Sequence, residues 1–303
     1  MSYKGSAVKR GEWLELMPGK VGQTDQDPYT AAIGWLEGTL QVPSKLLFRL
    51  KQNDEIKVAG DRIRVRLFPK RDYGFEPHWD ELNVLYEDDY CLVVHKPVGL
   101  KVHPAGDGQG LTLANLVAAH YAGQGEQAAV RHIHRLDEFT SGPVLYAKNE
   151  YAQLILDESM RAKGIDRTYA AIVEGILDPS IHRIDAPIGR DRHHAKRQRV
   201  SPGGKPAVTR VIRAESFGSF SLVRLELETG RTHQIRVHMS YIGHPLVGDT
   251  LYGGSNTFTS YQALHGESLT FPHPLTGEQL VIQDPWPKQF VDLYHKLSGN
   301  PRL

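Results

Sequence analysis

The sequence predicts an α+β fold in which helices and loops flank a mixed, largely antiparallel central sheet. Predicted strands outnumber predicted helices, and the two do not alternate strictly, as they would in a doubly wound parallel fold. The chain has 303 residues, of which 40% are hydrophobic and 23% are charged, a composition typical of a globular protein. This length suits a large domain with a small one attached, and we expect a unit over residues 1–75 and a domain over residues 76–303.

The first 75 residues predict a short helix and a basic hairpin. Ser44 is a good N-cap for a helix over residues 45–51, whose leucines share one face. Residues 55–58 and 62–66 alternate polar with apolar side chains, as half-buried strands do, and the turn residues Ala59-Gly60-Asp61 lie between them. Residues 71–80 contain Gly74 and Pro77 with little periodicity, so we expect a linker there.

The larger domain predicts a series of strands with three helices among them. Residues 90–95 form an apolar strand that runs into a proline- and glycine-containing turn. Thr112 and Asn149 each suit the N-cap of a helix, and Gly164 suits the end of the second. The remaining predicted elements are strands over residues 144–147, 168–173, 207–213 and 222–228, and a helix over residues 233–242 that Gly243 ends.

Residues 131–142 contain the strongest local candidate for chemistry. They predict a short strand that ends in an acid, Asp137, followed by a turn at Ser141-Gly142. An acid at a strand end beside a glycine turn, flanked by arginines, lies where functional sites tend to occur. The pattern alone leaves open that Asp137 caps the turn or pairs with Arg135 at the surface.

Two stretches carry most of the positive charge of a chain whose formal net charge is only +1. Residues 42–71 hold nine lysines and arginines against three acids, and residues 190–205 hold six against one. Such stretches are typical of proteins that bind a polyanion, although a solvated basic surface is the alternative. The single cysteine, Cys91, argues against a disulfide framework and for a reducing cytoplasm. No apolar run approaches the ~20 residues of a membrane helix.

Several motifs, which follow one another in a fixed order along the chain, resemble those of a known family. They are His134-Arg135-Leu136-Asp137 with Thr140-Ser141-Gly142, the segment 96–104, the strand with Tyr169, residues 229–238 (TGRTHQIRVH), and Leu264-His265 with Phe271 and His273-Pro274. Together they resemble the RluA-type pseudouridine synthase family, from about Leu82 to Gln283. The resemblance implies the pseudouridine synthase fold for the larger domain.

The resemblance also implies a reaction and roles for its residues. Uridine becomes pseudouridine when the C–N glycosidic bond breaks, the base turns and a C–C bond forms. Asp137 would be the essential carboxylate, a group that can attack or stabilise a reacting sugar, and Arg236 its charged partner. Tyr169 would stack on the base and relay the C5 proton, and Leu264 would line the uracil pocket. Structural roles remain open for these three: a salt bridge for Arg236 and core packing for Tyr169 and Leu264.

The remaining site residues are expected to bind RNA. A base inside folded RNA must be extruded to reach the carboxylate, and the resemblance implies that Arg135 enters the space left behind. His134 and Arg231 belong to the motifs and are expected at the substrate, while Arg192, Lys196 and Arg197 lie in a segment that resembles a phosphate-binding loop. The first 75 residues resemble a degenerate S4-type RNA-binding unit, because Ala59-Gly60 replaces the usual NG turn; a basic appendage without a defined role is the alternative.

The expected substrate is large-subunit ribosomal RNA, with transfer RNA as the main alternative. A non-catalytic RNA-binding assembly factor is less favoured because the chain keeps both Asp137 and Arg236. A glycosidase-like hydrolase normally needs two carboxylates across the bond, and the adjacent Glu138 would point away from Asp137 in a strand. The isomerisation is redox-neutral, so we expect no cofactor and no metal, and we expect a cytoplasmic monomer that does not bind membranes.

Overall fold

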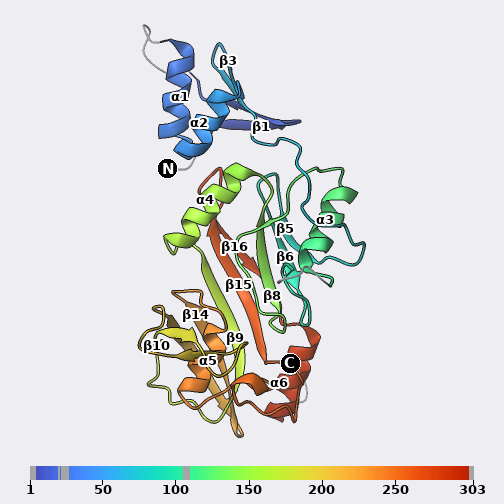
Figure 1. Ribbon diagram of the computed structural model, residues 1–303, viewed down its shortest axis with the longest axis vertical. Helices are drawn as coiled ribbons and strands as arrows, with labels where there is room; N and C mark the ends of the chain where they lie inside the picture. Colours follow the sequence, from blue (N-terminus) through green and yellow to red (C-terminus); the bar gives the residue numbers. More distant parts are fainter. Residues whose placement is uncertain (1–4, 20, 22–26, 105–109, 300–303) are drawn as a thin grey trace.

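The computed structural model describes residues 5–19, 21, 27–104 and 110–299 of the protein. A small N-terminal unit lies at one end of the long axis, a four-stranded sheet lies in the middle, and a six-stranded sheet extends to the other end (Figure 1). In the described part of the chain, every pairing between named strands is antiparallel, and parallel pairing occurs only as isolated bridges. The predicted α+β fold with a largely antiparallel sheet is therefore confirmed.

The N-terminal unit consists of a sheet in the order β1-β2-β4-β3 and two helices. Its elements are β1 (Ser6–Arg10), β2 (Trp13–Met17), α1 (Pro28–Gly38), α2 (Ser44–Gln52), β3 (Ile56–Ala59) and β4 (Arg62–Val65). The predicted hairpin is confirmed, with Ala59 opposite Arg62 at the turn. The predicted Ser44 cap is wrong: Pro43 is the N-cap and Ser44 is the first helical residue, because the carbonyl of Pro43 already accepts the N–H of Leu47 at 2.9 Å.

The middle sheet has the order β5-β6-β8-β7 and is accompanied by two helices. Its elements are β5 (Val84–Glu87), β6 (Cys91–Lys96), α3 (Leu113–Gly123), β7 (Arg131–His132), β8 (Gly142–Ala147) and α4 (Glu150–Arg161). Both predicted caps are confirmed: Thr112 forms a capping box with Asn115, and Asn149 accepts the N–H of Ala152 at 2.8 Å. The predicted stop at Gly164 is wrong, since α4 ends at Arg161 and Lys163 adopts the left-handed conformation there.

The second sheet has the order β10-β13-β14-β9-β15-β16 and contributes most of the candidate site. Its elements are β9 (Asp166–Glu174), β10 (Arg183–Asp185), β13 (Val208–Phe217), β14 (Phe220–Leu227), β15 (Leu264–Pro272) and β16 (Gln279–Gln283). The accompanying elements are the hairpin β11 (Ile188–Arg190) and β12 (Gln198–Val200), α5 (Gln234–Tyr241), the 3₁₀ turn η1 (Thr250–Tyr252) and α6 (Lys288–Ser298). In Figure 1, β9 and β15 run from this end of the molecule into the middle.

The two large sheets meet where β8 begins. Ser141 forms a parallel bridge with His265, and the N–H of Gly266 donates to the carbonyl of Ser141 at 2.8 Å. Gly142 has φ 139°, and a Cβ there would lie 2.7 Å from the backbone nitrogen of Gly266. Only glycine permits so close an approach with this backbone conformation, so the Ser141-Gly142 pair is a structural joint.

A continuous apolar core attaches the N-terminal unit to the middle sheet. Buried side chains of the unit, such as Leu46 and Leu50, belong to one cluster with Cys91 and Leu156 of the larger domain. The hydroxyl of Tyr151 on α4 also donates to the carbonyl of Leu40 at 3.1 Å. The unit therefore packs directly against the larger domain.

The strand predicted over residues 131–137 is wrong beyond its first two residues. β7 ends at His132, and the chain then turns until β8 begins at Gly142. The N–H of Thr140 donates to the carbonyl of Asp137 at 3.0 Å, which closes a turn that an extended strand could not make. Asp137 consequently lies in a loop that crosses between the two sheets.

Candidate active site

A cleft of about 680 Å³ lies between the two large sheets. Its walls come from residues 133–137 with Thr140, the end of α4, the start of β9, and the segment that joins β14 to α5. Seven of the predicted site residues line it: Asp137, Arg236, Tyr169, Leu264, Arg135, His134 and Arg231. Segments almost 100 residues apart in the chain thus meet at one place.

Asp137 lies in this cleft with one carboxylate oxygen bound and the other available. Its Oδ2 accepts a hydrogen bond from Nη1 of Arg236 at 3.0 Å, and Nε2 of His233 lies 3.9 Å from the same oxygen. Among the described residues, Oδ1 has no hydrogen-bond partner, and the side chain is 25% exposed. The ion pair therefore orients the carboxylate while leaving an oxygen accessible from the cleft.

A second carboxylate, Asp249, holds the arginine in place. Nε of Arg236 donates to Oδ2 of Asp249 at 2.6 Å and Nη2 donates to Oδ1 at 2.9 Å. Burial alone would lower the pKa of Arg236, but hydrogen bonding to Asp249 and the charge of Asp137 raise it above its usual value. The guanidinium thus stays charged and has a fixed orientation, because a bidentate fork permits only one plane.

Tyr252 connects this arginine to the basic hairpin. The guanidinium of Arg236 lies 4.9 Å from the ring centroid of Tyr252, and that of Arg197 lies 5.5 Å from it. The phenol oxygen accepts the N–H of Gln198 on β12 at 2.9 Å and lies 2.8 Å from Nδ1 of His233. One side chain thus contacts the partner of Asp137 and the β11–β12 hairpin.

Lys96 organises the loop that carries Asp137. Its fully buried ammonium donates to the carbonyls of Pro97, Leu100 and Glu138 at 2.7–2.9 Å. Burial lowers the pKa of Lys96 to about 7, and the charge of Asp137 opposes that shift. These three bonds fix the backbone beside Asp137, a local role that the lysine of the sequence motif did not itself suggest.

Tyr169 and Leu264 form the apolar part of the cleft. They come from the neighbouring strands β9 and β15, and each is 5% exposed. Burial raises the pKa of Tyr169, although the charge of Arg167 opposes this, so the phenol is neutral at physiological pH. Both residues also belong to the main core cluster, so each side chain packs in the core and also lines the cleft.

His134 has a more structural position than the sequence suggested. It is 7% exposed, and its Nε2 accepts the N–H of Leu145 on β8 at 3.2 Å. Burial, followed by the charge of Arg167, lowers the pKa of His134 to about 3. The ring is therefore neutral and supports the Asp137 loop from behind, while still contributing to the cleft wall.

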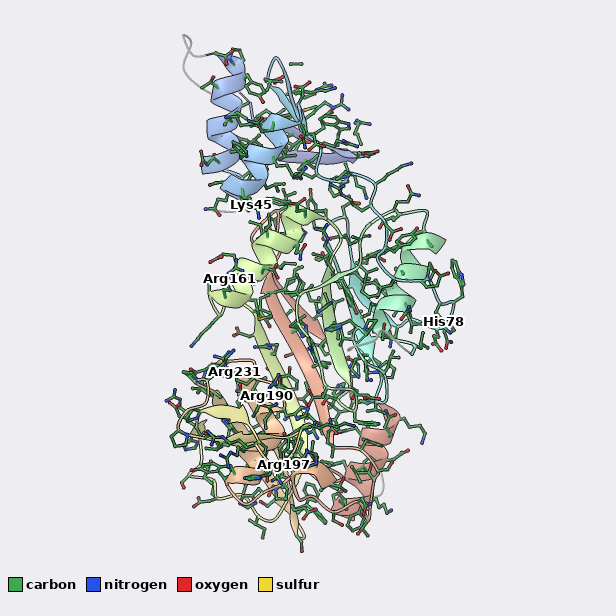
Figure 2. All side chains as sticks on the ribbon, in the orientation of Figure 1. Lys45, His78, Arg161, Arg190, Arg197 and Arg231 are labelled. Carbon is green, nitrogen blue, oxygen red and sulfur yellow. The ribbon has the colours of Figure 1, made fainter. Side chains whose placement is uncertain are left out.

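The arginines at the cleft edge differ in how firmly they are held. Arg135 is exposed and, within the described part of the chain, has no ion-pair partner. Nε of Arg231 donates to the carbonyl of Pro206 at 2.8 Å. Arg192 and Lys196 are exposed in the β11–β12 hairpin, outside the cleft wall, whereas Arg197 is half-buried against Tyr252. Figure 2 shows Arg197 and Arg231 in the half of the molecule that holds α5.

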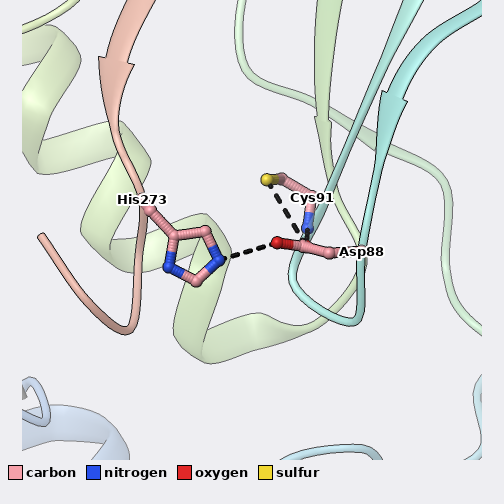
Figure 3. Close-up of side chains that lie close together, drawn as sticks. All are labelled: Asp88, Cys91 and His273. Carbon is pink, nitrogen blue, oxygen red and sulfur yellow. Dashed lines mark hydrogen bonds and ion pairs between the residues drawn. The ribbon is translucent and has the colours of Figure 1, made fainter. Parts of the chain in front are cut away.

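A possible metal-ligand group lies elsewhere. Within the described ranges, Asp88, Cys91 and His273 are the one set of three such side chains whose ligand atoms lie within 4.8 Å of one another (Figure 3). Nε2 of His273 bonds Asp88 at 2.7 Å, and burial raises the pKa of the Cys91 thiol. Asp88 also accepts the N–H groups of Tyr90 and Cys91. We assign the group a structural role, because both carboxylate oxygens of Asp88 are already hydrogen-bonded, Oδ1 to the N–H groups of Tyr90 and Cys91 and Oδ2 to His273.

Two residues of the site, Asp249 and Tyr252, were not identified from the sequence. Asp249 is 112 positions from Asp137 in the chain, and neither it nor Tyr252 stands in a motif that the sequence singled out. Asp249 follows Gly248 in an apolar stretch, and a buried acid there indicates a functional site only once its partner is known.

No helix within the described residues is long and apolar enough to cross a membrane.

Comparisons with known proteins match the chain to one family. Residues 89–241 match the sequence model of a family described as RNA pseudouridylate synthase. The chain is 47% identical over 243 residues to the uncharacterized RNA pseudouridine synthase YhcT of Bacillus subtilis, covering 80% of each chain. It is 36% identical to ribosomal large subunit pseudouridine synthase D of Haemophilus influenzae, covering 88% of this chain and 86% of that protein.

Solved structures give the same result. The human RNA pseudouridylate synthase domain containing 4 matches with a TM-score of 0.59 and 27% identity, covering 71% of this chain and 92% of that chain. The human RNA pseudouridylate synthase domain containing 1 matches with a TM-score of 0.57 and 28% identity, covering 70% and 86%. The matched family region, residues 89–241, includes Asp137, Tyr169 and Arg236 of the cleft.

Proposed function

Because this chain belongs to the RNA pseudouridylate synthase family, we propose that it converts uridine to pseudouridine in large-subunit ribosomal RNA, with Asp137 as the catalytic carboxylate. The observation that carries the proposal is the position of Asp137 in the cleft, hydrogen-bonded to an arginine that Asp249 holds rigid. The name of the Haemophilus influenzae relative supports ribosomal RNA as the substrate.

The geometry suits a carboxylate that reacts through one oxygen. Arg236 occupies Oδ2 of Asp137, so Oδ1 is the atom that meets the sugar or the base. Either as a nucleophile or as a counter-charge to a cationic sugar, an oriented carboxylate lowers the barrier to breaking the glycosidic bond. Arg236 keeps that carboxylate in position as the base leaves, turns and rejoins through carbon.

Tyr169 and Leu264 are proposed to hold the detached uracil. An aromatic ring and an aliphatic side chain from adjacent strands form two apolar surfaces within the same cleft, and a planar base stacks readily on an aromatic face. Because its pKa is raised by burial, the Tyr169 phenol is neutral in the resting enzyme. A neutral phenol can take up the C5 proton only while it passes its own proton on. Tyr169 would therefore relay the proton rather than act as the final base.

Arg135 is proposed to stabilise RNA from which the target base has been extruded. It lies two residues before Asp137, is exposed and has a guanidinium without an ion-pair partner among the described residues. A planar cation of this kind can stack in the gap that an extruded base leaves. Replacement of Arg135 with Ala is expected to reduce turnover on folded RNA at least tenfold with little change in melting temperature. Full activity on folded RNA would contradict the extrusion role.

The backbone of the RNA is proposed to contact the β11–β12 hairpin and the cleft edge. Arg192, Lys196 and Arg197 lie between β11 and β12, and Arg231 lines the cleft, so these residues bring four positive charges to this region. Contacts of this type give affinity and salt dependence rather than sequence choice.

The N-terminal unit is proposed to act as an S4-like RNA-binding unit. On α2, Lys45, Phe48 and Lys51 are spaced three residues apart, and the Phe48 side chain is 65% exposed. Two cations flanking an exposed aromatic ring offer phosphate contacts and a stacking surface for a base. This arrangement favours RNA binding over the alternative of an appendage without a role.

Two experiments test the proposal. Asp137→Asn should bind RNA like the wild type but form no pseudouridine in a ribosomal RNA transcript, whereas the adjacent Glu138→Gln, whose carboxylate does not line the cleft, should stay active. Activity of Asp137→Asn would contradict the catalytic assignment. Chemical mapping of pseudouridine in cells without the gene should reveal a missing site in large-subunit RNA; a missing site in transfer RNA instead would redirect the substrate assignment.

A further inference from the structure

Arg167 is a cation in the cleft that has no ion-pair partner among the described residues. It lies on β9, two residues before Tyr169, so both side chains project from the same face of the strand. Arg167 lines the cleft, and its Nε is buried without a hydrogen-bond partner. Across the described ranges, its guanidinium forms no ion pair, although partly buried arginines are normally paired.

The acids nearby are already engaged by other cations. Glu226 and Glu228 line the same cleft, but Arg210 binds Glu226 at 3.2 Å, and Lys163 and Arg183 lie 4.0 and 3.8 Å from Glu228. Asp166 also lines the cleft, but it precedes Arg167 on the strand, so the two side chains project from opposite faces. Among the described residues, none of these carboxylates forms an ion pair with Arg167.

Gly230 keeps the guanidinium in place. A Cβ at Gly230 would lie 3.0 Å from Nη1 and 3.4 Å from Nη2 of Arg167. The guanidinium therefore packs directly on the backbone of the segment that joins β14 to α5, the same segment that carries Arg231. A cation held in position without a counter-charge is poised for an anionic ligand, and the anions of RNA are its phosphates.

The position along β9 distinguishes the RNA backbone from the base. Two residues of an extended strand cover about 6.6 Å, so Arg167 lies beyond the uracil site that Tyr169 defines. Its end of the cleft also holds Arg161 and Lys163 at the end of α4, and Arg161 lies above Arg231 in the view of Figure 2. The guanidinium can therefore reach the chain next to the target nucleotide while the base remains at Tyr169.

We propose that Arg167 binds a backbone phosphate adjacent to the target uridine, on the side of the cleft nearest α4. The inference rests on the proposed function, since it takes an RNA strand as the substrate. Arg167 would then contact the substrate in addition to the proposed catalytic residues Asp137, Arg236 and Tyr169. The contact would fix the strand in register, so that the uridine rather than its neighbour enters the uracil site.

Binding as a function of salt concentration tests the proposal. Each variant is made in the inactive Asp137→Asn background, and its affinity for an unmodified large-subunit ribosomal RNA transcript is measured from 50 to 300 mM salt. Loss of one phosphate contact should reduce the slope of log affinity against log salt by about 0.7 and weaken binding about fivefold. Arg167→Gln should show both effects, whereas Arg167→Lys should keep the slope and lose only part of the affinity, because it keeps the charge without the fork.

One control variant and a second test variant make the result specific. Arg213→Gln removes an exposed arginine on β13 that pairs only loosely with Glu215, at 3.5 Å, and should leave affinity and slope unchanged. Gly230→Ala retains every charge but pushes the guanidinium aside, so it should weaken binding without altering the melting temperature by more than a few degrees. Melting curves for all variants establish that they are folded.

The possible outcomes separate the two proposals. If Arg167→Gln binds with the wild-type affinity and slope, the phosphate contact is wrong. If its affinity is unchanged but, with Asp137 intact, the pH profile of turnover shifts, Arg167 acts on Tyr169 instead, and the phosphate contact is again wrong. If the active enzyme forms no pseudouridine in any RNA while Arg167→Gln still weakens binding, the proposed function fails and the phosphate contact stands.

Discussion

Asp249 accepts two hydrogen bonds from Arg236, at 2.6 Å from Nε and 2.9 Å from Nη2, while Nη1 of the same guanidinium donates to Asp137 at 3.0 Å. The arginine therefore spans two carboxylates with different surroundings: Asp249 has a side chain that is 1% exposed, and Asp137 has one that is 25% exposed. The buried carboxylate anchors the arginine, and the more exposed one faces the cleft.

Replacement of Asp249 with Asn should impair both folding and turnover. The change leaves the buried Arg236 with one carboxylate partner instead of two, and breaking a buried ion pair costs about 3 kcal/mol or more. We also expect kcat to fall about 100-fold, because the guanidinium that orients Asp137 loses its fork. Urea denaturation and single-turnover kinetics measure the two effects. Asp292→Asn, in an exposed pair with Lys288 on α6, is the control and should change neither.

Replacement of Tyr252 with Phe should weaken RNA binding through the hairpin. The phenol oxygen that accepts the N–H of Gln198 and contacts His233 would be lost, at a cost of about 1 kcal/mol. We expect about a fivefold loss of affinity for RNA, with the ring contacts to Arg236 and Arg197 retained. Tyr241→Phe, at a position that is 61% exposed, is the control. Equal RNA affinities for Tyr252→Phe and Tyr241→Phe would show that RNA binding does not depend on the hydrogen bond between Tyr252 and Gln198.

Replacement of Gly142 with Ala should separate the two large sheets. The added Cβ would lie 2.7 and 2.8 Å from the backbone nitrogen and Cα of Gly266, so one strand must move. Overpacking of this kind and the strained φ of 139° together should cost about 3 kcal/mol or more. Gly60→Ala also has a positive φ, of 61°, but meets no atom within 4 Å. A similar loss of stability in both variants would attribute the effect to backbone conformation alone.

The free energy of unfolding should decrease as the pH falls below 7, because of His134. The folded state holds this ring neutral, with a pKa of about 3, whereas in the unfolded chain it takes up a proton below about pH 6.5. Between these values the unfolded state binds more protons, so stability decreases as pH falls. His134 should account for a loss of about 2 kcal/mol between pH 7 and pH 5.

Denaturation by urea at pH 7 and pH 5 measures this contribution. His134→Gln should lose about 2 kcal/mol less than the wild type over that interval, whatever its stability at pH 7. His78→Gln, at an exposed position, should follow the wild type. A pH dependence that is unchanged in His134→Gln would mean that the folded protein accommodates the charged ring.

Local patterns in the sequence were sufficient where the deciding contacts are local. Thr112 and Asn149 cap their helices through residues three positions away, and the β3–β4 hairpin closes through its own turn. Local rules failed where distant chain competes. The Asp137 segment continues the alternation of β7, but it must bend to bring Ser141 against His265, 124 residues away. The strand therefore ends at His132.

The sequence by itself determined the fold class and the family, because both depend on patterns and motifs that can be read in order along the chain. It also provided Asp137, Arg236 and Tyr169 as a set. Only the tertiary structure decided how they are held: Asp249 and Tyr252 reach Arg236, Lys96 fixes the loop beside Asp137, and Arg167 has no ion-pair partner in the described part of the chain. The physical reason is that ion pairing and burial depend on distances in space, which the separation of two residues along a chain does not specify.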